Sequence, residues 1–410
     1  MPKLWAQNNV LVLFTIARYG ETMARSNAAQ KRPPVKELPS APAGAYDDVS
    51  EMLGVVVEHE RRRGRGAQSN ASGRYEPLAR IAFDDGWRTL DELPPFKTTV
   101  AVDSTRKIIT RNESPDIGFD RSINPYRGCE HGCVYCFARP THAYLGMSPG
   151  LDFESKLLVK PEAAALLEKE LAAPGYEPKV IAIGTNTDPY QPIERRYKVM
   201  RRILEVLDAA GHPVGIVTKS ALVLRDLDIL ARMAERNLAK VALSVTSLDP
   251  VLARKMEPRA ATPMRRLETL RRLAQAGVPT TVMVAPIIPA LNDMEIERIL
   301  EAAATAGVRE AGFVLLRLPL EVRDLFSEWL KANYPDRHAH VFKLIRDMRG
   351  GKDYDSTWGT RMKGTGPYAW MIGRRFEMAC EKLGLNTERR QLTTEHFRKP
   401  EPDSQQLKLF

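Results

Sequence analysis

The feature that most constrains the fold is a regular alternation of short apolar runs and helical segments that begins near residue 120. The apolar runs predict six strands, at Ser122–Pro125, Lys179–Gly184, Val214–Thr218, Lys240–Thr246, Thr280–Pro286 and Ala311–Arg317. A period of about 3.6 residues predicts helices after them, at Pro161–Ala172, Glu194–Ala210, Arg225–Arg236, Pro263–Ala276, Asp293–Ala306 and Glu321–Ala332. Most of the strands have the composition of strands buried on both faces. The sequence therefore predicts an α/β fold built from six strand-helix units around a parallel sheet.

Six parallel strands can form an open doubly wound sheet or a curved partial barrel, and both bind ligands at the carboxyl ends of the strands. The loop after the first predicted strand is therefore expected on the functional rim. It contains no G-x-G-x-x-G dinucleotide motif. It contains instead three of the four cysteines of the chain, Cys129, Cys133 and Cys136, at a C-x3-C-x2-C spacing.

The cysteine spacing indicates a metal centre rather than a disulfide framework. Disulfide frameworks are typical of small secreted chains with an even set of cysteines, whereas this chain has 410 residues and four cysteines. The three cysteines are compatible with two kinds of metal centre. Zinc would need a fourth ligand, which His131 or His142 could supply. An iron-sulfur cluster held by only three thiolates would leave one iron free to bind a substrate or cofactor.

The C-x3-C-x2-C spacing, with Tyr135 just before the third cysteine, resembles the radical S-adenosylmethionine (SAM) superfamily. The resemblance implies a partial (β/α)6 barrel whose cluster loop follows the first strand. It also implies that Cys129, Cys133 and Cys136 bind a 4Fe-4S cluster, that Tyr135 contacts the cofactor, and that the open iron binds SAM. Reductive cleavage of SAM would then yield a 5′-deoxyadenosyl radical that abstracts hydrogen from a substrate. Such an enzyme needs a one-electron reductant of the flavodoxin or ferredoxin type.

Further cofactor contacts follow from the resemblance by position. The loop after the second strand usually carries a Gly-Gly-Glu-like motif that accepts the ammonium group of SAM. This chain departs from that motif at Gly184–Pro192, so the candidates are Thr185, Asn186, Thr187 and Asp188, of which Asp188 alone is charged. The alternative is a proline-bounded turn stabilised by its own hydrogen bonds.

The later strand ends supply the other candidates. Ser244 and Thr246 are expected near the ribose, and Arg259 near the carboxylate of SAM, although Arg259 could instead form a surface ion pair with Glu257. Lys219 and Arg317 are expected at the same mouth, as substrate contacts or as structural salt bridges.

Within the superfamily, Asn124–Cys136, Gly184–Pro192 and Thr218-Lys219-Ser220 resemble the group that includes spore photoproduct lyase, over roughly residues 110–320. That lyase reverses a thymine dimer and uses a barrel cysteine as hydrogen donor. Here the cysteine outside the motif is Cys380, far along the chain, and a lone helical cysteine is usually a small buried hydrophobe. The same repair reaction is not supported. Tyr190 is another candidate hydrogen donor.

The charge of the chain favours an anionic partner. A net charge of +10 points to nucleic acid as the leading class, with a generally basic surface as the alternative. Two rival functions remain open at this stage. One is a zinc-stabilised nucleic-acid-binding protein without catalysis, and the other is an iron-sulfur electron carrier or sensor.

Composition and periodicity divide the chain into four parts. These are a flexible basic N-terminal arm (1–72), an extension packing on the barrel (73–115), the barrel (116–334) and a C-terminal helical extension (335–410). The arm holds a possible short helix at Asp48–Val57 and a basic cluster at Arg61–Gly66 that could follow phosphates.

The C-terminal extension contains three recognisable segments. Asp353–Pro367 is glycine-rich, basic and aromatic, and could contact a nucleotide strand, form a lid over the barrel mouth or be a plain loop. A helix is predicted at Tyr368–Leu383, and a frayed end from Thr387.

The start of the chain predicts no membrane attachment. The apolar run Val10–Ala17 is too short to span a bilayer, and its flanks do not have the pattern of a signal peptide. Met23 is a plausible true start. A reduced, cytoplasmic location is expected because the chain would carry an oxygen-labile cluster.

Overall fold

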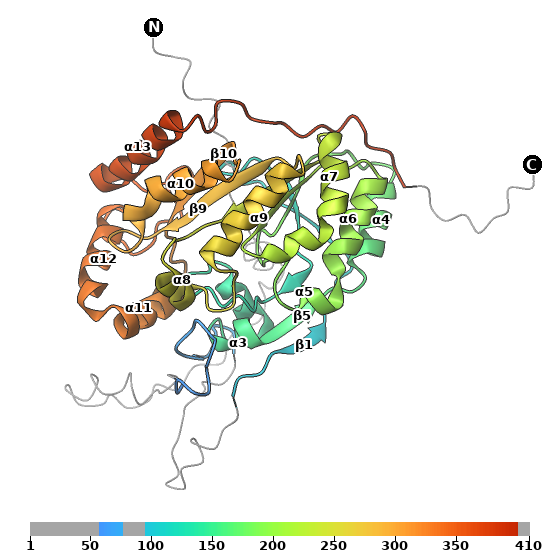
Figure 1. The fold of residues 1–410 in the computed structure, drawn as a ribbon. Coiled ribbons are helices and arrows are strands. Elements are labelled where there is room, and N and C mark those ends of the chain that lie inside the picture. The colour runs from blue at the N-terminus through green and yellow to red at the C-terminus, as the bar shows by residue number, and fades with distance from the viewer. Residues whose placement is uncertain (1–56, 77–94, 401–410) are drawn as a thin grey trace, which may run out of the picture.

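The computed structural model describes residues 57–76 and 95–400. Its main sheet has seven strands in the order β10-β9-β8-β7-β6-β3-β2 (Figure 1). The strands are β2 (Ile109–Arg111), β3 (Arg121–Ile123), β6 (Ile181–Ile183), β7 (Val214–Thr218), β8 (Ala239–Ser244), β9 (Thr280–Ile287) and β10 (Glu310–Leu315). All pairs from β3 to β10 are parallel, and β2 adds an antiparallel edge. The predicted α/β class with six parallel strands is confirmed, and in the described residues β10 and β2 do not pair to close a barrel.

Helices alternate with these strands and cover the outer face of the sheet (Figure 1). They are α4 (Ala163–Ala172), α5 (Glu194–Tyr197), α6 (Val199–Ala209), η2 (Ala221–Asp226), α7 (Leu227–Glu235), α8 (Pro250–Met256), α9 (Pro263–Gln275), η3 (Asp293–Glu295) and α10 (Ile296–Thr305). After the last strand come α11 (Val322–Asn333), α12 (Pro335–Asp347) and α13 (Gly366–Lys382). No helix in the described ranges has the length and apolar content needed to cross a bilayer.

One predicted helix, Glu194–Ala210, is divided in two. The chain breaks at Lys198, whose φ of 50° is left-handed. The buried Glu194 carboxylate accepts hydrogen bonds from the backbone N–H groups of Val199 (3.0 Å) and Met200 (3.2 Å). These are N–H groups of the first turn of α6, which otherwise lack partners. The break therefore lets one carboxylate cap the start of the second helix.

The two faces of the strands have different partners. Ile181, Ile183 and Ile216 pack against the covering helices in the main core. Ala182 and Val217 point to the opposite, concave face, because side chains alternate along a strand. Residues from the segment before β3 and from the segment after β10 join them there, namely Ile117, Phe119 and Met362. The concave face is thus partly filled, and the space above it is left for a ligand.

A smaller sheet supports the cysteine loop. It has the order β1-β5-β4 and comprises β1 (Thr99–Val102), β4 (Tyr126–Arg127) and β5 (Lys156–Val159). The short helices η1 (Arg139–Leu145) and α3 (Leu151–Ser155) complete this layer. Because β4 ends just before Cys129, the sheet anchors the start of the loop.

The end of the predicted flexible arm is packed rather than free. Arg65 is buried and donates to the backbone oxygen of Glu154 (2.6 Å). The backbone N–H groups of Gly66 and Ala67 donate to the Glu154 carboxylate (2.9 and 2.8 Å). The prediction of a free, phosphate-following segment is therefore wrong at Arg65–Gly66, because a distant buried carboxylate binds it. The possible helix at Asp48–Val57 lies outside the described residues except for Val57.

The predicted fraying from Thr387 is also wrong for the described residues up to 400. The backbone of Thr393 donates to Asn237 (3.0 Å) and that of Arg398 to Ala210 (2.9 Å), so the tail runs back across the ends of α7 and α6 (Figure 1). Phe397 packs edge-on against the ring of His212, 5.4 Å between centroids. A few apolar and backbone contacts therefore hold a polar segment in place.

His212, under this tail, should make folding stability depend on pH. Burial lowers the pKa of His212 to about 4. Between about pH 6.5 and pH 4 the unfolded chain binds a proton here that the folded chain does not, so stability falls as the pH falls through this range. From about pH 7 to pH 5 the loss is of the order of 2 kcal/mol. We expect the variant His212→Asn to lose less stability than the natural chain over this interval, measured by urea unfolding. Equal losses would contradict the assignment.

Candidate functional site

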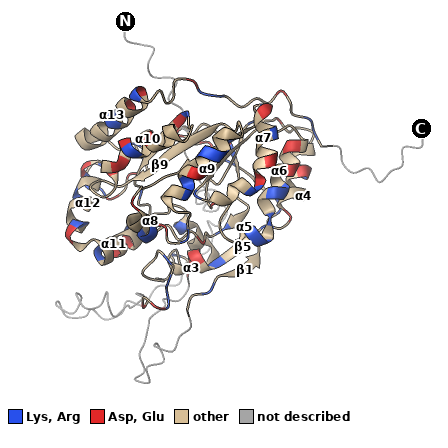
Figure 2. Cartoon of the chain, viewed as in Figure 1, with Lys and Arg blue, Asp and Glu red and all other residues tan. Residues whose placement is uncertain are grey.

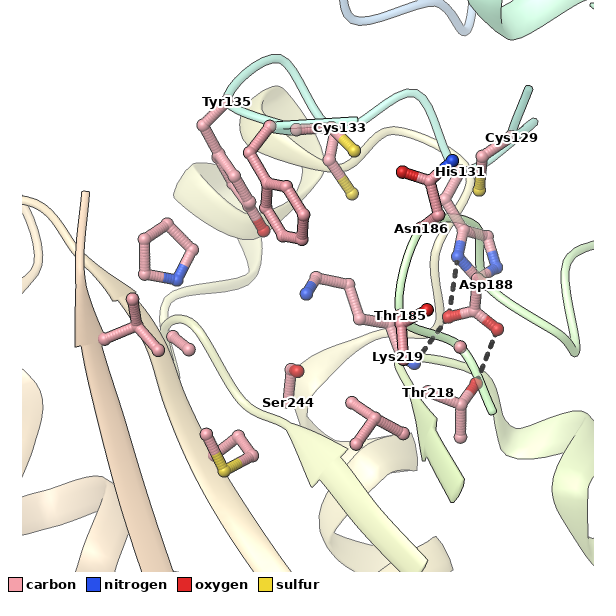
Figure 3. A pocket seen from close by; sticks show the side chains of 18 of the residues that line it. Cys129, His131, Cys133, Tyr135, Thr185, Asn186, Asp188, Thr218, Lys219 and Ser244 are labelled. Atoms are coloured by element: carbon pink, nitrogen blue, oxygen red, sulfur yellow. Dashed lines mark hydrogen bonds and ion pairs between the residues drawn. The ribbon is translucent and has the colours of Figure 1, made fainter. Parts of the chain in front are cut away.

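The cysteine loop lies at the carboxyl end of β3, over the concave face of the sheet (Figures 1 and 3). Two glycines shape it. Gly128 and Gly132 have φ values of 74° and 68°, which a residue with a side chain rarely adopts. A Cβ on Gly128 would lie 2.8 Å from the backbone oxygen of Phe153, and one on Gly132 would lie 2.8 Å from the Glu154 carboxylate. The loop therefore turns tightly on both sides of Cys129.

The three cysteines line one pocket of about 980 Å³, together with the ends of the parallel strands. Cys129 and Cys133 are buried, Cys136 is half-buried, and all three are free thiols. Figure 3 shows Cys129 and Cys133 directed into the pocket. Burial raises the pKa of each thiol, so each is protonated without a metal, and metal binding would release these protons.

The spacing of these donors suits a cluster better than a single ion. In the described part of the chain, no three His, Cys, Asp or Glu side chains lie close enough together to hold one metal ion. A cubane cluster is larger than an ion and takes one thiolate at each of several irons. Three free thiols around one pocket, two of them buried and one half-buried, therefore fit a 4Fe-4S group with one iron left open.

A buried ion pair supports the loop from behind. The Arg139 guanidinium lies 2.5 Å from the Glu154 carboxylate, and both side chains are fully buried. Arg139 also donates to the backbone oxygens of Cys133 (3.0 Å), Pro149 (3.0 Å) and Gly150 (3.0 Å). The guanidinium thus fixes the middle of the loop and places a positive charge near the thiols.

Asp188 lies at the pocket wall but is fully engaged by the protein. One carboxylate oxygen accepts from the Thr218 hydroxyl (2.7 Å) and from the Tyr190 backbone (2.9 Å). The other accepts from the Lys219 backbone (2.7 Å) and lies 3.3 Å from Nδ1 of His131. Burial alone would raise the pKa of Asp188, but His131 and these donors outweigh it and lower the pKa to about 2. Since a carboxylate offers about four acceptor positions, little capacity remains for an ammonium group.

The rest of the same loop is organised by Asn124, a residue that the sequence reasoning did not single out. Its side chain donates to the Thr185 hydroxyl (2.9 Å) and accepts from the Asn186 backbone (2.8 Å). Thr187 also lines the pocket, and its hydroxyl donates to the Tyr126 backbone oxygen (3.1 Å). The side-chain oxygen of Asn186 is buried, lines the pocket and has no hydrogen-bond partner in the described residues. The sequence signal that could have identified Asn124 as a site residue is its position, since it is a polar residue at the end of a predicted strand.

A second buried charge cluster lies beside Cys133. The Glu257 carboxylate pairs with Arg266, and accepts from the hydroxyls of Tyr135 and Thr246. Arg266 also donates to the backbone oxygen of Ser244 (3.0 Å). Ser244 and Tyr135 line the pocket, whereas the Thr246 side chain belongs to this cluster and does not. Arg266 was not predicted from the sequence as a site residue, because an arginine at its position in a helix is usually exposed.

Arg259 is not brought into the cysteine pocket. Its guanidinium is exposed and lies 3.2 Å from the Glu130 carboxylate. The alternative pair with Glu257 is absent as well, because Glu257 is taken by Arg266. The predicted position of Arg259 near the carboxylate of SAM is therefore not supported by the geometry.

Two other cations do line the pocket. Figure 3 shows the Lys219 ammonium directed into its centre, 5.8 Å from the centre of the Tyr135 ring. Among the described residues, Lys219 forms no salt bridge. Arg317 lies over the Phe137 ring at 5.3 Å and donates to the Tyr354 hydroxyl (3.1 Å). Lys219 is thus the more available charge for an anionic ligand.

The segment Asp353–Pro367 closes one side of the mouth, as the lid alternative predicted. Met362 lines the pocket, and its backbone oxygen accepts from the Leu315 backbone (2.9 Å). Arg361 forms a buried pair with Asp116 at 2.5 Å. This pair joins the C-terminal segment to the chain that precedes β3.

The two candidate hydrogen donors lie away from the pocket. Tyr190 is fully buried and donates to the Asp226 carboxylate (3.1 Å), outside the pocket lining. Cys380 is buried on α13 within the main core, as predicted for a small apolar side chain. Neither side chain lines the cysteine pocket.

Comparison with known proteins identifies the architecture. Residues 123–303 match the family model of the Radical SAM superfamily. An uncharacterised protein of Mycobacterium tuberculosis is 40% identical over 230 residues, which cover 56% of this chain and 68% of the relative. The chain belongs to the radical SAM superfamily. Its cofactors are therefore a 4Fe-4S cluster and SAM, and it requires an external one-electron reductant.

Other relatives extend the comparison. An uncharacterised protein of Methanocaldococcus jannaschii is 29% identical over 219 residues, covering 53% of this chain and 78% of the relative. Spore photoproduct lyase complexed with dinucleoside spore photoproduct has a TM-score of 0.51 at 18% identity, covering 70% of this chain and 80% of the lyase. A variant of the same lyase also has a TM-score of 0.51, at 20% identity, with the same coverage of the two chains. At such identity the likeness concerns the fold alone.

Proposed function

We propose that this protein cleaves SAM reductively and uses the resulting radical to abstract a hydrogen atom from a substrate. The observation that carries the proposal is one pocket in which three free thiols face polar strand ends. When bound there, the cluster and SAM supply a 5′-deoxyadenosyl radical. The protein contributes position and the exclusion of water, since the geometry of the bound substrate decides which hydrogen is lost.

Cys129, Cys133 and Cys136 would hold the cluster, and the pocket wall would hold SAM. For the ammonium group we propose the Asn186 side-chain oxygen, because it is buried without a partner while Asp188 is saturated. Thr185 lies beside Asn186 and Ser244 is available to a ribose hydroxyl. Thr187 and Tyr135, which line the pocket, and Thr246, which does not, would hold the pocket wall in place through their own hydrogen bonds.

Lys219 should bind the SAM carboxylate in place of Arg259. A charge-assisted hydrogen bond contributes about 1.5–3 kcal/mol, which corresponds to roughly 10- to 150-fold in affinity. The variant Lys219→Met keeps most of the side-chain volume and removes the charge. We expect it to weaken SAM binding by that factor in equilibrium dialysis with labelled SAM, while Arg259→Met should change it little. Equal SAM affinity in Lys219→Met and the natural protein would exclude this contact.

The proposed substrate class is nucleic acid. The net charge of +10 favours an anionic partner. The lyase that shares this fold was solved with a dinucleoside photoproduct. Thymine-dimer repair by the route of that lyase is not proposed, because Cys380 is buried far from the pocket. We further propose a cytoplasmic location, in keeping with an oxygen-labile cluster.

The test uses full-length protein with its cluster reconstituted anaerobically. Dithionite and SAM should yield 5′-deoxyadenosine, and DNA, lesion-bearing DNA or RNA should raise its release above the background if one of them is the substrate class. Iron and acid-labile sulfide with no SAM cleavage would favour an electron carrier or sensor instead. One zinc per chain, without sulfide, would favour a structural metal site.

A further inference from the structure

A second cavity, of about 800 Å³, lies behind the cysteine loop. We call it the basic recess. It is lined by Arg195 from α5, Arg259 from the α8–α9 connection and Arg265 from α9, together with His131 and Ser220. No Asp or Glu is among its lining residues. The recess therefore presents three guanidinium groups, of which that of Arg259 pairs with Glu130 (3.2 Å), a residue outside the lining.

The basic recess and the cysteine pocket meet at one residue. Among the residues that the structure describes, His131 alone lines both cavities. His131 is 2% exposed and follows Cys129 by two positions in the loop. Its backbone oxygen accepts from the Arg259 backbone (3.3 Å), which joins the wall of the recess to the loop. The recess thus opens from the surface toward the back of the loop that carries the thiols.

The arginines of the recess differ from other surface arginines nearby. Arg195 and Arg265 are exposed, and in the described part of the chain neither forms a salt bridge. By contrast, Arg201 on α6, Arg232 on α7 and Arg271 on α9 are each paired with a carboxylate at 2.6–2.8 Å. Figure 2 shows basic residues on α5 and α9, the helices that contribute these side chains. Among the described residues, Arg195 and Arg265 thus bring positive charge to the recess without a salt-bridge partner, whereas Arg259 pairs with Glu130 at 3.2 Å.

We propose that the basic recess is the docking site of the acidic protein that reduces the cluster. This inference rests on the proposed function. The thiols are buried and the cysteine pocket is needed for SAM and substrate, so an electron donor must approach the loop from another side. The recess provides such an approach, with His131 as the single residue between the two cavities. Reduced flavodoxin or ferredoxin would lose one electron and the cluster would gain it, and no bond forms or breaks.

The chemistry of the recess suits a transient, electrostatically steered partner. Electron-transfer complexes have small interfaces, and complementary charge mainly raises their rate of association. Nucleic acid is the competing anionic ligand. It is less favoured here because the recess shares only His131 with the pocket in which the substrate must meet the radical. An acidic electron carrier needs only to approach the loop.

The test reverses charge at two exposed residues, in the double variant Arg195→Glu/Arg265→Glu. With an acidic flavodoxin at low salt, we expect the dissociation constant of the double-variant holoenzyme to be about ten-fold or more above that of the natural holoenzyme, measured by calorimetry. The difference between the two dissociation constants should become smaller as salt is added. The rate of cluster reduction by flavodoxin hydroquinone should fall similarly in stopped-flow absorption. Cleavage of SAM driven by dithionite should keep its rate, because this small reductant does not need the docking surface.

The matched control is Arg298→Glu, which reverses an exposed arginine on α10 outside the recess. It should leave flavodoxin binding unchanged. Flavodoxin affinity that is equal in the double variant and the natural protein would overturn the proposal. So would a selective loss of nucleic-acid affinity with normal flavodoxin binding. If dithionite produces no deoxyadenosine even in the natural protein, the proposed function fails, while the flavodoxin affinities still decide whether the recess is a docking site.

Discussion

Replacing Cys133 by alanine should reduce 5′-deoxyadenosine formation to the background level. Cys133 is buried at the centre of the loop, and its thiol faces the pocket that also contains Cys129 and Cys136. A cluster that is already held by only three thiolates would keep two. The Cys133→Ala protein should therefore also lose most of its iron and acid-labile sulfide after reconstitution, measured by metal analysis and by the visible absorption of the 4Fe-4S centre.

Cys380→Ala is the matched control. The Cys380 side chain is buried in the main core and accepts a hydrogen bond from Asn386 (3.7 Å), away from the pocket. This variant removes one sulfur atom of the same kind and should keep its iron, sulfide and SAM cleavage. Retention of the cluster and of activity in Cys133→Ala would contradict the assignment of the loop as the cluster site.

Replacing Glu154 by alanine should produce the largest loss of folding stability. Glu154 is fully buried and is bound by the Arg139 guanidinium and by the backbone N–H groups of Gly66 and Ala67. Its removal leaves a buried positive charge without a counterion and two N–H groups without an acceptor. Breaking a buried pair from one side typically costs about 3–5 kcal/mol. The free energy of unfolding of the apoprotein, from urea titration under reducing conditions, should fall by this amount.

A surface pair provides the comparison for Glu154. Glu205 is exposed and lies 3.0 Å from Arg201 on the same helix. Because exposed ion pairs contribute about 0–1 kcal/mol, Glu205→Ala should change stability little. In the double variant Arg139→Met/Glu154→Leu no unpaired charge is left, so part of the loss should be recovered. Equal losses in Glu154→Ala and Glu205→Ala would show that the buried pair does not support the loop.

Much of the architecture could be predicted because its signals are local. Val214–Thr218 is a strand at the predicted positions, and the helix predicted at Pro263–Ala276 is found at Pro263–Gln275. The position of the cysteine loop after the first parallel strand also followed from the order of elements along the chain. Periodicity and motif spacing involve residues within a few turns of each other, so a sequence displays them directly.

The partners of the charged residues could not be predicted in the same way. Asp188, the one charged residue in its loop, lies against His131 and accepts hydrogen bonds from residues at the end of β7. Arg259 pairs with Glu130, and Glu257 with Arg266. Each of these pairings depends on how loops that follow different strands meet at the rim, which no local pattern encodes.

The sequence by itself determined the alternation of strands and helices, the superfamily and the three thiols, since these depend on composition and spacing along the chain. Only the tertiary structure decided which polar groups in the pocket remain free to bind a ligand and which form hydrogen bonds or ion pairs within the protein. It left Asn186 and Lys219 available and engaged Asp188 and Arg259. The physical reason is that a buried polar group must find a partner, and its partner is set by neighbours in space that can be far apart in sequence.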